Sequence, residues 1–545
     1  MGFFIDGFFI KPQKNFLRFD EKFDKGKGSR NMSKTAIELR GITKRFGSVV
    51  ANHNVNLKVY KGEILSLLGE NGSGKTTLMN MISGIYHPDE GEIFIDGKLA
   101  HIHSPHDAFN YKIGMIHQHF KLVDLFSAAE NIVLGLEEKG KFNVRHVSER
   151  VAEISAKYGF DIDPNKKIYE MSVSEKQTVE IIKVLYRGAD ILILDEPTAV
   201  LTPQETKKLF DVLRRMRDDG KAIIIITHKL HEVLELSDKV VVLRHGEYVG
   251  TVNTAEANEH ILTEMMVGKK VELNITRKTP VNPQDRLVVE HINCRNREGI
   301  KVLDDVSFVA RSGEILGIAG IAGSGQRELL EAIAGLQKLE EGSILYYNPK
   351  TGEEENLRNK TPLQIRELGV RLSFVPEDRL GMGLVGNMGM VDNMMLRSYR
   401  KGNSIFLERS EPEKLAKQII EELEVVTPDA ETPVRRLSGG NVQKVLLGRE
   451  IASSPTLLMA AYPVRGLDIN SSYLIYDLLN EQKEKGVAVI FVGEDLDVLL
   501  DLCDRILVIG NGRITGVVDA RTATKNEIGY LMTKTVYKED ANDAT

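Results

Sequence analysis

Near its start the chain contains a run of residues whose types and spacing suit the binding of phosphate groups. The pattern G-x-x-x-x-G-K-[ST] is matched, in order, by Gly69, Glu70, Asn71, Gly72, Ser73, Gly74, Lys75 and Thr76. A strand pattern, EILSLL (63–68), precedes this motif and a helical pattern follows it, which is the context of a phosphate-binding loop, or P-loop. We expect Lys75 on the β- and γ-phosphates of a nucleotide and Thr76 on Mg²⁺, with Thr77 also in the binding set. The alternative is a glycine-rich turn followed by a chance Lys-Thr pair.

An acidic pair, Asp195 and Glu196, follows the apolar run 191–194. Carboxylates at the end of a buried strand are costly unless they meet cations. We expect Asp195 to hold Mg²⁺ and Glu196 to position or deprotonate an attacking water molecule. An ordinary charged loop is the alternative.

The elements that position these residues are those of an α/β fold. Continuous apolar runs such as 191–194 and 222–227 alternate with helical patterns. Such runs are typical of parallel strands that are buried on both faces. Phosphate chemistry is then expected at the carboxyl ends of the strands.

The chain repeats itself, so the two halves are expected to be two domains. Residues 57–84 align with 308–335, and residues 236–250 align with 502–516. The predicted boundaries are an N-terminal extension over 1–32, a first domain over 33–272, a linker over 273–285, a second domain over 286–535 and a tail over 536–545. The extension is expected to be disordered, or translation begins at Met32.

With these motifs the chain resembles the ATPases of ABC transporters over about 33–535. In that family His228 (in IIIITHKL) resembles the histidine that contacts the γ-phosphate, and Gln118 (in GMIHQHF) resembles the Q-loop glutamine that senses Mg²⁺–ATP. Phe46 resembles the aromatic residue that stacks on adenine. A satisfied structural histidine and a buried aromatic residue are the alternatives for His228 and Phe46. His117 and His119 could form a metal pair, but loop packing is favoured because no further ligands are evident.

The resemblance also implies a head-to-tail pseudo-dimer, in which each P-loop faces the signature loop of the other half. The intact signature is LSGGN (437–441), a serine-glycine loop that is expected to precede the helical run VQKVLLGREIA. From the second half it would bring Ser438, Gly439 and Gly440, together with the D-loop residue Asp468, to the first P-loop. This composite, site one, would use Glu196, His228 and Gln118 for catalysis, with Mg²⁺ held by Thr76, Gln118 and Asp195.

Site two would be formed by the second P-loop and the signature region of the first half, and it lacks the residues that hydrolysis needs. Gln326 and Arg327 replace the P-loop Lys-Thr pair, Ala461 and Tyr462 replace the acidic pair, and Glu377 and Glu494 replace the glutamine and histidine. The first half contributes Ser172, Val173 and Ser174 in place of an intact signature, and Thr202 in place of the D-loop aspartate. One catalytic site and one structural site are therefore expected.

Fused ATPases of this kind resemble those of bacterial sugar-type and nucleoside-type importers. The stretches 115–135 and 187–205 are most similar to the nucleoside branch. That resemblance implies two transmembrane permease subunits, an extracellular substrate-binding lipoprotein that acts indirectly, and a peripheral position on the cytoplasmic side of the cell membrane. A simple-sugar importer is the alternative cargo class, and a soluble tandem ABC ATPase is a more distant one.

Composition excludes several other classes. The net charge of −6 gives no reason to expect nucleic-acid binding. Cys294 and Cys503 lack metal-ligand spacing and are expected to be buried small hydrophobic residues. No run of 18 apolar residues is present, so the chain is not expected to span a membrane by itself.

Overall fold

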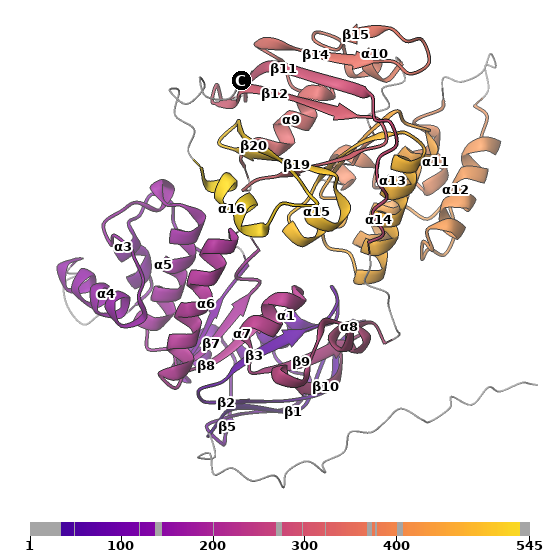
Figure 1. Cartoon of the computed structure of the whole chain (residues 1–545). Coiled ribbons are helices and arrows are strands. Elements are labelled where there is room, and N and C mark those ends of the chain that lie inside the picture. Colours follow the sequence, from indigo (N-terminus) through magenta and orange to yellow (C-terminus); the bar gives the residue numbers. More distant parts are fainter. Residues whose placement is uncertain are drawn as a thin grey trace, which may run out of the picture.

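The computed structural model describes residues 34–534, apart from 48, 119, 137–143, 200, 269–274, 297, 322, 368–372, 376–378 and 400–406. The predicted extension and tail therefore lie outside the described residues, as do His119 and Glu377. Two similar α/β halves follow each other along the chain (Figure 1). The prediction of an α/β fold with two tandem P-loop domains is confirmed.

The first half has two sheets. The antiparallel sheet has the order β2 (Val49–Tyr60), β1 (Thr35–Phe46), β4 (Glu90–Ile95), β5 (Lys98–Ala100). The six-stranded sheet has the order β10 (Glu247–Asn253), β9 (Lys239–Arg244), β3 (Ile64–Leu68), β8 (Ala222–Ile226), β7 (Ile191–Asp195), β6 (Ile113–Ile116), and only β10 runs antiparallel to its neighbour. Its helices are α1 (Lys75–Ile82), α2 (Pro105–Asn110), α3 (Ala128–Val133), α4 (Val144–Tyr158), α5 (Val173–Tyr186), α6 (Pro203–Asp218), α7 (Leu230–Leu236) and α8 (Glu259–Val267).

The second half repeats this plan. Its antiparallel sheet has the order β12 (Lys301–Arg311), β11 (Asp285–Arg295), β14 (Glu341–Tyr347), β15 (Glu354–Asn356). Its six-stranded sheet has the order β16 (Ser373–Val375), β17 (Leu457–Ala461), β18 (Ala488–Val492), β13 (Ile315–Ala319), β19 (Arg505–Gly510), β20 (Arg513–Asp519). Its helices are α9 (Gln326–Ile333), α10 (Pro362–Glu367), α11 (Met390–Met395), α12 (Ser410–Glu422), α13 (Gly439–Ala452), α14 (Ile469–Glu484), α15 (Leu496–Leu502) and α16 (Lys525–Thr533).

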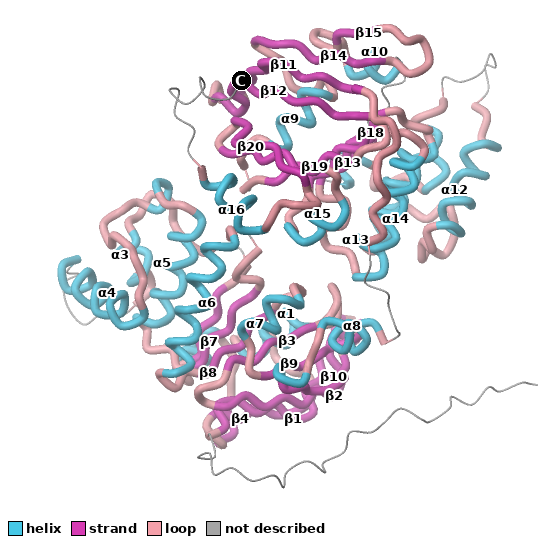
Figure 2. Tube along the Cα trace, viewed as in Figure 1, coloured by secondary structure: helices cyan, strands magenta, loops and turns pink. Residues whose placement is uncertain are grey.

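The central strands are buried on both faces, as their apolar runs predict. Every residue of β3, β7 and β8 is buried, and the same holds for β13, β17 and β18. One face of each central sheet packs on the antiparallel sheet, the helix after the P-loop and a short helix, α2 in the first half and α10 in the second. The other face packs on longer helices, among them α5 and α6 in the first half and α13 and α14 in the second. Helices α3 to α6 stand together to one side of the strands of the first half (Figure 2). This layering exposes the carboxyl ends of β3, β6, β7 and β8, where the site is expected.

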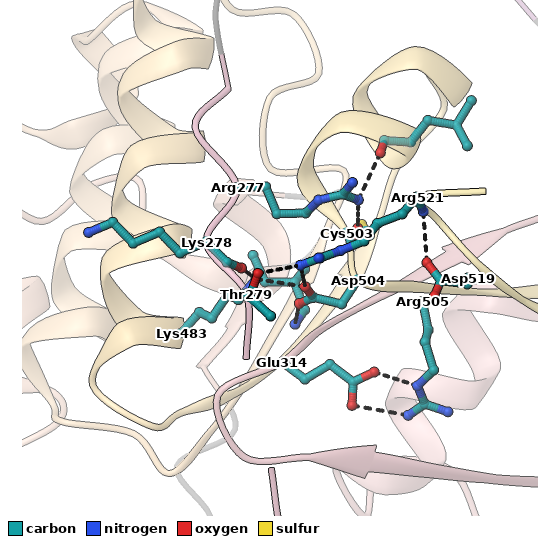
Figure 3. Close-up of polar contacts among 12 residues, drawn as sticks. Arg277, Lys278, Thr279, Glu314, Lys483, Cys503, Asp504, Arg505, Asp519 and Arg521 are labelled. Carbon is teal, nitrogen blue, oxygen red and sulfur yellow. Dashed lines mark hydrogen bonds and ion pairs between the residues drawn. The ribbon is translucent and has the colours of Figure 1, made fainter. Parts of the chain in front are cut away.

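The chain between the halves is attached to the second half. Arg277 donates to the backbone oxygens of Leu500 and Cys503, and Lys483 donates to the backbone oxygen of Lys278 at 2.5 Å (Figure 3). Lys483 also pairs with Asp504 at 2.8 Å, where both side chains are buried. The domain boundaries at 272 and 286 remain predictions, since the last helix of the first half ends at Val267 and β11 begins at Asp285.

Both cysteines are buried, as expected, and burial raises the pKa of the Cys294 thiol to about 11. In the described ranges, no helix combines the length and apolar character needed to cross a bilayer.

Candidate active site

The P-loop joins β3 to α1 in a backbone conformation that requires glycine. Gly72 and Gly74 have φ values of 81° and 91°, and a Cβ atom on Gly74 would lie 2.3 Å from the backbone oxygen of Ala51. A Cβ atom on Gly69 would lie 2.3 Å from the backbone oxygen of Leu243. Larger residues cannot occupy Gly69 or Gly74 without moving the backbone.

The Lys75 side chain lies inside this loop. Its Nζ donates to the backbone oxygens of Gly69 and Glu70 at 2.7 and 2.9 Å. Burial lowers the pKa of the Lys75 ammonium, and the carboxylates of Glu196 and Asp195 act in the opposite direction. The ammonium is therefore held in the loop and faces the acidic pair at the end of β7, which is the arrangement that a phosphate-binding lysine needs.

Three strand ends converge on Glu196. Gln118 follows β6, Glu196 follows β7 and His228 follows β8. Gln118 Nε2 donates to one carboxylate oxygen of Glu196 at 2.8 Å, and His228 Nδ1 lies 3.1 Å from the other. The three predicted catalytic residues are thus brought together by adjacent parallel strands.

Adjacent carboxylates in this site have opposite pKa shifts. Burial, with the charge of Glu196, raises the pKa of Asp195 to about 6, although Lys75 and a hydrogen bond from the Thr76 hydroxyl oppose this. The hydrogen bond with His228 lowers the pKa of Glu196, and it outweighs the effect of burial. Glu196 is therefore the carboxylate that stays ionised and available to accept a proton.

Glu196 lies in an unusual backbone conformation, with a φ of 46°. Its N–H donates to the backbone oxygen of Ile226 at 2.9 Å, which ties the turn after β7 to the end of β8. A residue other than glycine at positive φ costs energy and persists where the surroundings impose it. The turn directs the Glu196 side chain toward Gln118 and His228.

Phe46 is exposed, at 44% of its surface, so the alternative of a buried aromatic residue is wrong. Its ring makes an edge contact with Tyr86, with 5.2 Å between the ring centroids. Lys44 Nζ lies 5.6 Å from the ring centroid of Phe46. An exposed ring at the end of β1 could stack on a base, and this role stays a prediction.

The second half faces the first P-loop through its D-loop. Asn71 Nδ2 donates to the backbone oxygen of Leu467 at 3.3 Å. The Glu70 carboxylate accepts a hydrogen bond from the backbone of Ile469, and burial, followed by the charge of Asp468, raises its pKa. The sequence identified Glu70 and Asn71 as P-loop positions but gave no sign that they touch the other half. That contact appears only once the two domains are placed together.

A second contact between the halves lies at α16 and α6 (Figure 1). Gln204 Nε2 donates to the backbone oxygen of Asn526 at 3.2 Å, and a Cβ atom on Gly529 would lie 2.7 Å from the Gln204 side chain. Together with the D-loop contact, this supports the head-to-tail arrangement.

The signature glycines form the first turn of α13 instead of a loop before it. Ser438 is the N-cap, and its hydroxyl accepts from the Asn441 side chain at 2.9 Å. Within the described part of the chain, no hydrogen bond or ion pair joins Ser438, Gly439 or Gly440 to residues 69–77. Their contact with a nucleotide therefore stays a prediction.

Helix α5 of the first half has a different N-terminus. Ser172 is its N-cap, and the Glu175 carboxylate accepts from the Ser172 N–H at 2.7 Å in a capping box. Lys166 pairs with Glu175 at 2.7 Å. A carboxylate of the helix already occupies the position that attracts anions at a helix N-terminus. The N-terminus of α13 has no such carboxylate.

Site two keeps the scaffold of site one without its chemistry. Gln326 Nε2 donates to the backbone oxygen of Ile321 at 3.0 Å and so replaces the Lys75 contact. Tyr462 has a φ of 49°, close to that of Glu196, and its N–H donates to the backbone oxygen of Val492 at 2.9 Å. Glu494 pairs with Arg465 at 3.4 Å. The turn at Tyr462 thus has a similar positive φ to the turn at Glu196, but site two lacks the carboxylate and the histidine that could activate water.

The fold and the P-loop site define a tandem nucleotide-binding protein of the ABC type. A model of the ABC transporter family matches residues 52–199 and 303–463, which is one match in each half. The chain is 42% identical to the nucleoside import ATP-binding protein NupA of Lactococcus lactis, over 92% of this chain and 98% of that protein. It is 43% identical to the guanosine import ATP-binding protein NupO of Bacillus subtilis, with the same coverage. It is 38% identical to the ribose import ATP-binding protein RbsA 1 of Rubrobacter xylanophilus, over 91% and 98%.

The chain therefore belongs to the ABC transporter family. ATP-binding proteins of this family bind and hydrolyse ATP, so the chain is an ATP hydrolase.

Proposed function

We propose that this chain hydrolyses ATP to power the inward transport of a nucleoside through partner permeases. The observation that carries the proposal is its likeness, over nearly its whole length, to nucleoside and guanosine import ATP-binding proteins. The role requires two transmembrane permease subunits and an extracellular substrate-binding lipoprotein that acts indirectly. We place the chain at the cytoplasmic face of the cell membrane, held by permease contacts near Gln118 and Glu377.

In this proposal the P-loop of the first half binds ATP and Mg²⁺. The Thr76 hydroxyl and the Asp195 carboxylate already share a hydrogen bond, and such oxygen donors suit Mg²⁺. With the side-chain oxygen of Gln118, they would hold the ion. When bound, Mg²⁺ neutralises charge on the β- and γ-phosphate oxygens. Lys75 and the N–H groups of the loop orient the same phosphates.

Glu196 then accepts the proton of the attacking water molecule. The water oxygen forms a bond to the γ-phosphorus, and the bond from that phosphorus to the β-phosphate oxygen breaks, which yields ADP and phosphate. Gln118 and His228 hold the two carboxylate oxygens, so Glu196 needs little reorganisation before it accepts the proton. Ser438, Gly439, Gly440 and Asp468 complete the site from the second half, and Phe46 stacks on the adenine.

A simple sugar is the second candidate cargo, because the chain is also 38% identical to a ribose import ATP-binding protein. Cargo does not touch these domains in either case. The identity values favour the nucleoside class by only a few per cent.

Uptake in a strain that lacks this chain tests the cargo. We expect uptake of labelled guanosine or adenosine to be lost and restored by the intact chain, while ribose and galactose uptake continues. Normal nucleoside uptake with lost sugar uptake would contradict the nucleoside assignment and leave the ATPase assignment intact.

A further inference from the structure

Arg379 joins two separate elements that the second half presents to site one. Its Nη1 donates to the backbone oxygen of Gly439, in the first turn of α13, at 3.1 Å. Its Nη2 donates to the backbone oxygen of Arg465, at the start of the segment that leads to Asp468. The signature turn and the D-loop are therefore held by one guanidinium group.

The D-loop end of this connection reaches the working P-loop. Two residues after Arg465, the backbone oxygen of Leu467 accepts from Asn71 at 3.3 Å. A continuous set of contacts thus runs from the signature turn through Arg379 and the D-loop to the first half.

The contacts suit arginine in particular. A guanidinium is a planar fork of donors that can reach two acceptors in different directions, whereas a lysine ammonium is a compact point charge. Both acceptors here are backbone oxygens, and no ion pair joins Arg379 to a carboxylate in the described residues. Burial, with the nearby charge of Arg465, lowers the pKa of Arg379. Arg379 is half-buried, and its two hydrogen bonds to backbone oxygens offset part of the cost of removing its charge from water.

The first half offers an internal comparison. Strands β6 and β16 correspond, and Phe120 and Arg379 each lie four residues after the strand end, at Ile116 and Val375. Phenylalanine has no donor and cannot join the corresponding elements. The arginine is thus present only in the half whose signature turn and D-loop serve the catalytic site.

We propose that Arg379 is a positioning residue for ATP hydrolysis, which fixes the signature turn of α13 and the D-loop relative to each other. The second half then presents both elements to the first P-loop as one unit. Because its partners are backbone oxygens of the second half, Arg379 acts through them and not on the nucleotide itself. The inference rests on the proposed composite site.

The test compares Arg379→Ala with the wild type in the full-length chain. We expect kcat to fall by about 10- to 100-fold, since small misplacements of catalytic elements have effects of this order. The affinity for a fluorescent ATP analogue at the first P-loop should stay within about threefold, because that half keeps all its own contacts. Free guanidinium ion, at millimolar concentration, should restore part of the rate. Restoration distinguishes positioning by this group from a general loss of folding.

Arg436→Ala is the matched control, because Arg436 is exposed and lies two residues before Ser438. It should keep the wild-type rate and show no response to guanidinium. If Arg379→Ala is poorly folded, Arg379→Gln keeps most of the side-chain length and should show the same loss of kcat at unchanged affinity.

A wild-type rate for Arg379→Ala would overturn the inference, as would a loss that guanidinium does not reverse. Glu196→Gln in the same assay separates this inference from the proposed function. If Glu196→Gln is inactive and Arg379→Ala is fully active, only the role of Arg379 falls. If Glu196→Gln is fully active, the composite site itself is wrong.

Discussion

At the residue scale, the neighbouring carboxylates of Asp195 and Glu196 lie in different environments, which suit Asp195 to binding Mg²⁺ and Glu196 to accepting a proton. Asp195 is buried at the end of β7, where its pKa rises to about 6, and its hydrogen bond comes from the Thr76 hydroxyl. The pKa of Glu196 is lowered by its hydrogen bond with His228, and Gln118 holds its other oxygen. Neighbouring carboxylates whose pKa values are shifted in opposite directions by their environments are typical of acid–base and metal-assisted sites.

Glu196→Gln is expected to preserve ATP binding and to lower kcat by at least about 100-fold, because the amide cannot accept the proton. Steady-state ATP hydrolysis and binding of a fluorescent nucleotide check the two parts separately. Tyr462→Phe, at the corresponding turn of the second half, is the matched control and should leave the rate unchanged. A Glu196→Gln variant that hydrolyses ATP at the wild-type rate would remove the assignment of the base.

Asp195→Asn is expected to stabilise the nucleotide-free protein while it abolishes Mg²⁺-dependent hydrolysis. Ionisation of Asp195 is harder in the folded state, since its pKa rises from 3.8 to about 6. The wild type therefore loses stability as the pH rises from about 4 to about 6, on the order of 1–3 kcal/mol in total. The Asn amide removes this cost and its oxygen still accepts from Thr76.

Thermal unfolding in EDTA at pH 8 and at pH 4 checks this prediction. The variant should have the higher Tm at pH 8 and a much smaller advantage at pH 4, where the wild-type carboxyl is protonated in the folded state. An advantage that is equal at both pH values, or a lower Tm at pH 8, contradicts it.

At the scale of elements, each half has an ion pair at the same position of its fold, but the two pairs differ in burial. Lys483 of α14 and Asp504, before β19, have exposed side-chain fractions of 2% and 7%. Arg217 of α6 and Asp238, before β9, occupy the same positions at 27% and 40%. The segment with Arg277 and Lys278 packs beside the Lys483–Asp504 pair of the second half (Figure 3).

Lys483→Met should therefore destabilise the second half by about 3–5 kcal/mol, because the nearest cation left to the buried Asp504 is Arg521, 4.0 Å away. Arg217→Met, at the matching position, should cost no more than about 1 kcal/mol, as for an exposed pair. Chemical denaturation of the two variants measures the difference. Equal effects would show that the segment between the halves does not bury the Lys483–Asp504 pair in solution.

The elements themselves could be predicted well from the sequence. The apolar runs 191–194 and 222–227 contain buried strands, and α1 begins at the P-loop lysine as expected. The start of α13 was predicted less well. The signature residues were expected to form a loop before the helix, yet Ser438 caps a helix that begins with Gly439 and Gly440, although glycine has low helix propensity.

Other parts of the site depend on contacts that no local pattern contains. Glu70 and Asn71 touch the D-loop across almost 400 positions of the chain, and Arg379 reaches Gly439 across 60. The edge contact of Tyr86 with Phe46 likewise depends on how β1 lies beside the turn after α1. A motif therefore indicates which chemistry a residue can perform, whereas its contacts with distant residues depend on how the domains pack.

At the scale of the whole molecule, the intact motif residues of both halves belong to one composite site, and the altered residues of both halves belong to the other. Gln118, Glu196 and His228 meet in the first half, and the D-loop that reaches their P-loop comes from the second. At site two the turn at Tyr462 survives without an acidic pair, and the N-terminus of α5 is occupied by Glu175. Hydrolysis is therefore assigned to one site that both halves build.

Two arginine substitutions at matching N-caps test this assignment most directly. Ser438→Arg places a bulky side chain at the N-terminus of α13, facing site one, and Ser172→Arg does the same at α5 for site two. ATP hydrolysis should be measured for both variants in the complex with the permeases. We predict that Ser438→Arg abolishes hydrolysis, whereas Ser172→Arg keeps most of the wild-type rate; equal losses from the two variants would contradict the single composite site.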